Sequence, residues 1–95
     1  LHIAAVFCNN FPNHLFGIAK NILKKEYIPF SIMFPLIDMT VERIKDFEPF
    51  EVQTGPAFRN EKEIMQQHKA MLGKDECDIY ELLSNKIISY HSKEK

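Results

Sequence analysis

The sequence is poor in glycine, which occurs only three times among 95 residues. None of the three belongs to the G-x-G-x-x-G turn that binds a dinucleotide, to a phosphate-binding P-loop or to the nucleophile elbow of a hydrolase. Each of these motifs needs glycine because the backbone must turn sharply or approach a ligand closely. We therefore expect this chain alone to bind no dinucleotide and to be no catalyst by itself.

The sequence also lacks an excess of one charge and a long apolar run. Twelve basic and thirteen acidic residues give a net charge of −1, which disfavours nucleic acid as a partner because phosphate binding needs a basic surface. No apolar run approaches the roughly 20 residues that a membrane-spanning helix needs. The first residues lack an initiator Met and the basic segment of a signal peptide. We expect no membrane association and a cytoplasmic location.

Cysteine is scarce as well. Cys8 and Cys77 have no recurring spacing, so no disulfide framework is predicted, and a reducing compartment fits the pair. No two histidines or acidic residues have the spacing of metal ligands with a third ligand in view. We therefore predict no metal site.

What the sequence does contain is apolar periodicity. From Leu1 to about Tyr27, apolar side chains recur at alternating spacings of three and four residues, which places them on one stripe of a long helix. Pro12 removes the helical hydrogen bond to the carbonyl of Cys8, so we expect a kink there. The stripe comprises Leu1, Ala4, Cys8, Phe11, Leu15, Ile18 and Ile22.

A second helix is expected after a short connection. Ser31 is a suitable N-cap, and apolar residues recur on one face from Met33 to Phe47. Residues 48–59 show no helical period and contain Pro49 and Pro56, so they are predicted to form a structured connection.

Two further helices complete the pattern. Asn60, with Glu63 three residues later, resembles a capping box for a third helix that ends near Leu72. Asp75 is placed to cap a fourth helix whose apolar stripe reaches Tyr90. No pattern of alternating strand residues competes with these helices.

These patterns predict an all-α fold, a helical bundle of about four helices that forms one domain over residues 1–95. A domain of this size buries only about 60% of the surface that its unfolded chain exposes. Its stability is therefore marginal unless it docks on something larger, and we expect a partner surface.

One face of the first helix is rich in polar side chains. His2, Asn9, Asn13 and Lys20 fall within about 40° on a helical wheel, with Asn10 beside them. Amides are mediocre inside helices because they compete for backbone hydrogen bonds, so their clustering indicates another role. An amide can bind a hydroxyl, carbonyl or carboxylate, and a histidine can transfer a proton near neutral pH. A solvated outer face without function explains the same pattern.

The loop Gln53–Arg59 is the second candidate site. Pro56 biases Gly55 toward an extended backbone, so the loop is stiff and offers Thr54 and Arg59 from fixed positions. Arg59 directly precedes a helix start and is placed to bind a carboxylate or phosphate through two hydrogen bonds. The alternative is a structural arginine that ties the loop to a neighbouring carboxylate.

With these features in view, the sequence resembles the C-terminal helical domain of uncharacterised Rossmann-type proteins described as predicted NAD(P)-binding oxidoreductases. The second half of those proteins is a domain of unknown function. The resemblance covers nearly the whole chain, and the loop is its most specific part. It is carried by His2–Phe7, Asn9, Asn10, Asn13, His14, Leu36, Ile37, Gln53–Ala57, Arg59 and His68.

The resemblance implies the helical fold of the 6-phosphogluconate dehydrogenase C-terminal-like group, whose domains pair in a homodimer and close a cleft over the nicotinamide. In related enzymes the first long helix supplies a catalytic lysine and asparagines, and here His2 and Asn10 stand in that region. It also implies a Rossmann domain upstream of this chain that holds NADP or NAD. The sequence departs from the family at Pro12 and at Asn60-Glu61, where Gly-Asp is expected.

Two functions remain open. In the first, the chain is the substrate-binding and dimerisation domain of an NAD(P)-dependent oxidoreductase that acts on a small polar substrate. His2 and Asn10 would then be catalytic, and the substrate would be bound by Asn9, Asn13, Thr54, Gly55 and Arg59. In the second, the chain is a non-enzymatic helical dimerisation or ligand-sensing module.

Overall fold

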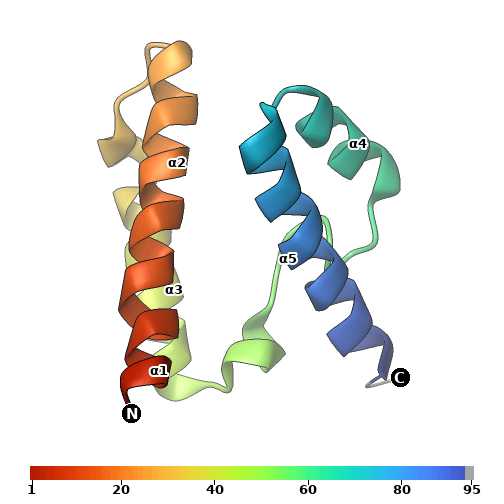
Figure 1. The fold of residues 1–95 in the computed structure, drawn as a ribbon. Coiled ribbons are helices and arrows are strands. Elements are labelled where there is room, and N and C mark those ends of the chain that lie inside the picture. The colour runs from red at the N-terminus through yellow and green to blue at the C-terminus, as the bar shows by residue number, and fades with distance from the viewer. Residues whose placement is uncertain (94–95) are drawn as a thin grey trace. The chain divides into compact units, whose positions relative to one another are not determined.

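A computed structural model describes residues 1–93, and within that range the chain forms helices and connections but no strand (Figure 1). The predicted all-α fold is confirmed, because each predicted helical segment is helical. The chain divides into two compact units, unit 1 from Leu1 to Lys45 and unit 2 from Asp46 to Lys95.

The first helix of unit 1 is long, as predicted, and contains an irregular turn. It consists of α1 (His2–Ala5), the π-helical turn η1 (Val6–Asn10) and α2 (Phe11–Lys25), which follow one another without a break (Figure 1). The N–H of Phe11 donates to the carbonyl of Val6, five residues back. Because Pro12 has no N–H to offer the carbonyl of Cys8, the helix departs from α geometry in the turn just before the proline.

The first helix ends in a Schellman motif. The N–H of Ile28 donates to the carbonyl of Leu23, and the N–H of Tyr27 donates to that of Lys24. Tyr27 occupies the position after the C-cap with a φ of 59°, a left-handed conformation that is usually reserved for glycine. The two hydrogen bonds satisfy carbonyls that the helix end leaves free.

The second helix begins later than predicted. The 3-10 turn η2 (Phe30–Met33) precedes α3 (Phe34–Asp46), and Pro29 is the N-cap of that turn. The prediction of Ser31 as N-cap is wrong, since the 3-10 turn takes up Ser31. Phe30 contacts two other rings, with centroids 6.4 Å from Phe16 and 5.8 Å from Phe34.

Unit 2 consists of the 3-10 turn η3 (Pro49–Val52), a loop, α4 (Lys62–Ala70) and α5 (Lys74–Lys93), and α4 packs against α5 (Figure 1). The predicted capping box is wrong, because Glu61 is the N-cap of α4 and Asn60 has a φ of 56°. Asp75 is likewise no cap, since it lies in the first turn of α5. There its carboxylate is suited to the positive end of the helix dipole.

Very little of the described chain is buried. Ala57 and Met65, both in unit 2, are the hydrophobic residues classed as buried, at 7% exposure each. Large apolar side chains on unit 1 remain open, among them Phe7 at 64% and Phe11 at 50%. The expected partner surface therefore has apolar side chains available to form it.

Candidate functional site

The polar residues predicted on the first helix are all exposed. His2 lies in α1, Asn9 and Asn10 lie in the π-helical turn, and Asn13 follows in the first turn of α2. None of the four side chains forms a hydrogen bond with another residue of the described range. Their donors and acceptors are therefore available to a ligand or to water.

The π-helical turn changes how these side chains are grouped. A π turn closes hydrogen bonds between residues i and i+5 and advances fewer degrees per residue than an α-helix. The helical wheel assumes one uniform angle, so it misplaces His2 relative to Asn13 on the far side of the turn. The neighbouring Asn9 and Asn10 share the turn itself, and π-helical turns occur frequently at functional sites.

The loop Gln53–Arg59 is a compact, hydrogen-bonded turn. The backbone N–H of Arg59 donates to the carbonyl of Gly55 at 3.2 Å, and the Gln53 side-chain amide donates to the carbonyl of Thr54 at 3.1 Å. Gly55 has a φ of 102°, which L-residues rarely adopt. The sequence analysis predicted an extended backbone at Gly55 and did not predict this positive φ, which accounts for the glycine at this position.

Asn60, directly after this loop, explains a departure from the family pattern. Its φ of 56° is left-handed, a conformation that glycine adopts freely and asparagine tolerates better than most residues. Asparagine can therefore stand where glycine was expected without changing the path of the backbone.

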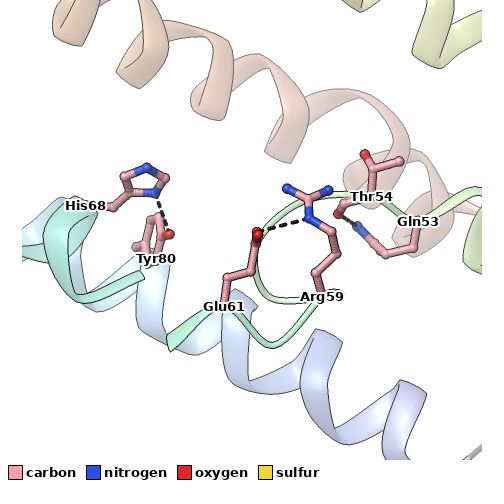
Figure 2. Close-up of polar contacts among 6 residues, drawn as sticks. All are labelled: Gln53, Thr54, Arg59, Glu61, His68 and Tyr80. Atoms are coloured by element: carbon pink, nitrogen blue, oxygen red, sulfur yellow. Dashed lines mark hydrogen bonds and ion pairs between the residues drawn. The ribbon is translucent and has the colours of Figure 1, made fainter. Parts of the chain in front are cut away.

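Arg59 already has a carboxylate partner. Its Nε donates to Oε1 of Glu61 at 3.0 Å, and both side chains are partly open to solvent (Figure 2). This contact is the structural role left open as the alternative. The two Nη nitrogens form no hydrogen bond within the described range, so the guanidinium retains donors for a second anion.

A polar pair that the sequence did not predict joins α4 to α5. Tyr80 Oη lies 2.7 Å from His68 Nδ1, with the ring centroids 5.7 Å apart (Figure 2). Burial raises the pKa of Tyr80, because the ionised phenolate would lose its hydration. The contact links one side chain of α4 to one of α5. The partners are twelve positions apart in the sequence, so their contact becomes visible only once α4 is seen packed against α5.

Other kinds of site are not supported among residues 1–93. No His, Cys, Asp or Glu cluster of three or more there is arranged to hold a metal ion. In the same range, no helix combines the length and apolar character needed to cross a membrane.

The arrangement of helices and loop defines an all-helical domain. Residues 1–87 match the family described as a domain of unknown function, DUF2520, and the chain belongs to that family. The suspected relationship to a domain of unknown function is thus confirmed. Among curated proteins, none matches this sequence.

The chain is also similar to a solved structure. The crystal structure of a putative NADP oxidoreductase from Bacteroides fragilis is 43% identical, with a TM-score of 0.88 over 93% of this chain. The matched region makes up 35% of the Bacteroides fragilis chain. This chain therefore corresponds to about a third of that protein's length.

Proposed function

We propose that this chain is the substrate-binding and dimerisation domain of an NAD(P)-dependent oxidoreductase that acts on a small polar substrate. The observation that carries the proposal is the 43% identity to the Bacteroides fragilis protein named as a putative NADP oxidoreductase. Because the matched region is 35% of that chain, a Rossmann domain upstream of residue 1 is expected to supply the other part. A cytoplasmic location belongs to the same proposal.

The exposed apolar side chains support an assembly larger than this chain. Phe7, Phe11 and Leu36 are each at least half exposed, and contiguous apolar surface on a soluble protein commonly marks an interaction site. In the proposed assembly the nucleotide-binding part and a second copy of the chain cover these residues. Burial of a large apolar side chain contributes about 1.5–3 kcal/mol.

The chain's polar residues then have distinct roles. His2 exchanges a proton with the substrate, and Asn10 orients the reacting group through its amide. Arg59 anchors a substrate carboxylate through its Nη nitrogens while Nε stays on Glu61. Asn9, Asn13, Thr54 and the backbone of Gly55 complete the substrate contacts.

The cofactor is expected to be held mainly outside this chain. NADP or NAD supplies or accepts the hydride when bound. With three glycines and no G-x-G-x-x-G turn, this chain lacks the backbone that cradles a pyrophosphate. Its residues therefore bind and orient the substrate and exclude water from the nicotinamide side.

A non-enzymatic dimerisation or ligand-sensing module is the alternative. The exposed apolar residues favour it as much as they favour the enzyme, because either assembly buries them. The two functions differ in whether the full-length protein binds a dinucleotide.

Calorimetric titration distinguishes the two. NADPH and NADH are titrated in parallel into the full-length protein and into the 95-residue chain. The proposal predicts saturable binding to the full-length protein and none to the chain. An absence of binding to both would favour the interaction module.

The substrate role of Arg59 has a separate test. Once a substrate screen identifies a turnover reaction, Arg59→Gln is expected to raise KM for a carboxylate substrate by about tenfold or more, because a charged hydrogen bond is lost. Lys62→Gln, which changes a neighbouring exposed cation, is the matched control. Equal kinetics for the two variants would exclude the anchoring role.

A further inference from the structure

Unit 2 contains a pocket that the proposed function does not use. It has a volume of about 350 Å³ and combines aromatic rings with acidic side chains. Its walls come from the start of η3, the loop before α4 and the last turns of α5. The lining residues are Glu48, Phe50, Glu51, Phe58, Tyr90 and His91.

The aromatic walls are held in two ring pairs. Phe50 stacks on Tyr90 with ring centroids 3.9 Å apart and an interplanar angle of 18°. Phe58 meets His91 edge to face at 4.8 Å. Phe50 and Phe58 remain 52% and 44% exposed, so surface on these rings is open to a ligand. The face of an aromatic ring carries negative charge density that attracts a cation.

The charge of the lining residues also favours a cation as the ligand. Glu48 and Glu51 bring two carboxylates, and among the residues that the structure describes the lining contains no lysine or arginine. Both glutamates are exposed, and neither is part of an ion pair in the described range. A ligand that neutralises them and stacks on a ring must combine positive charge with an organic surface.

His91 adds an independent observation. Its Nε2 is closed to solvent and has no hydrogen-bond partner among residues 1–93. Buried polar atoms are nearly always hydrogen-bonded in native proteins, so an orphaned one calls for an explanation. His91 also lines the pocket, and a ligand N–H is the kind of donor that its ring lacks.

We infer that this pocket binds an organic cation, an alkylammonium or alkylguanidinium group. The aromatic rings contact the alkyl chain and the charged group of the ligand. The two glutamates balance the positive charge, and His91 accepts one N–H. Two sources supply this chemistry: a free small molecule, or a lysine or arginine side chain from the rest of the full-length protein. The inference does not depend on the proposed oxidoreductase function.

The test is an NMR titration of the isotope-labelled full-length protein with n-butylguanidinium and n-butylammonium, with n-butanol as the neutral control. Saturable shifts of pocket amides with the cations but not with the alcohol are expected for a free ligand. Phe58→Leu should weaken that binding about three- to tenfold, from the lost cation–π contact. Glu63→Gln, an exposed change on α4, should leave it unaltered.

The titration gives a different result if the cation is a lysine or arginine side chain of the same protein. The pocket is then already filled, so the cations cause no shift. The double variant Glu48→Gln and Glu51→Gln then melts at a lower temperature than Glu63→Gln because it removes two charges from the filled pocket. Equal binding of n-butanol overturns the inference, as does an absence of both the shifts and the lowered melting temperature.

Discussion

Unit 1 and unit 2 are of similar length but are stabilised differently. None of the described residues of unit 1 is buried, whereas unit 2 buries Ala57 and Met65. The ring contacts of Phe30 link α2 to the segment that follows it in unit 1, while unit 2 adds the His68–Tyr80 hydrogen bond between helices. Unit 2 has the beginnings of its own core, whereas unit 1 leaves large apolar side chains such as Phe7 and Phe11 exposed.

The largest expected effect tests the core of unit 2. Met65→Ala should lower the free energy of unfolding by about 2–5 kcal/mol, because it removes a buried side chain and leaves a cavity. Met71→Ala is the matched control, since Met71 is 75% exposed at the end of the same helix. Urea denaturation of the full-length protein measures both, and similar losses for the two variants would show that unit 2 has no core of its own.

A smaller effect of opposite sign is expected in unit 1. Tyr27 holds a left-handed backbone at a φ of 59°, which costs an L-residue roughly 1–2 kcal/mol. Tyr27→Gly should therefore raise the free energy of unfolding by about 0.5–1 kcal/mol after the larger unfolded-state entropy of glycine is included.

The control for Tyr27 is Tyr27→Ala. Alanine removes the same ring but keeps the β-carbon, so thermal denaturation should show a gain for glycine and none for alanine. A loss of stability in both variants would mean that the Tyr27 ring is covered by another part of the protein.

The smallest effect concerns the α4–α5 contact in unit 2. Burial raises the pKa of Tyr80 above its ordinary value of 10.0, so above that pH the unfolded chain ionises first. Stability conferred by the neutral phenol is present below pH 10 and is lost as the pH rises through the folded-state pKa. In Tyr80→Phe the stability should fall less steeply as the pH rises, whereas in Tyr27→Phe it should fall as it does in the unaltered protein. Melting temperatures between pH 8 and pH 11 measure the difference.

The sequence predicted helix positions better than helix ends. Apolar periodicity located the first, second and fourth helices because a long stripe averages over many residues. Caps depend on one or two residues, and Ser31, Asn60 and Asp75 each looked suitable. Ser31 lies within a 3-10 turn, and Asn60 has a left-handed backbone. The last helix begins one residue before Asp75, so Asp75 lies inside it.

The candidate site was only partly accessible to sequence reasoning. Pro12 predicted a disturbance of the first helix but not its form, a π-helical turn that carries Asn9 and Asn10. From the sequence, Arg59 was expected either to bind a ligand or to pair with a structural carboxylate. The structure identifies Glu61 as its carboxylate partner. The contacts of His68 and His91 join residues far apart in sequence, so no local pattern could predict them. The roles of His2 and Asn10 stay predictions.

Amide hydrogen exchange of the full-length protein and of the 95-residue chain, under the same conditions, compares unit 1 with unit 2 most directly. Exchange reports the free energy of local opening, so it compares the two units within one molecule. We expect unit 1 to be protected in the full-length protein and to lose much more protection than unit 2 in the separate chain. Equal protection of unit 1 in both samples would overturn the proposal that other parts of the full-length protein cover its exposed apolar side chains.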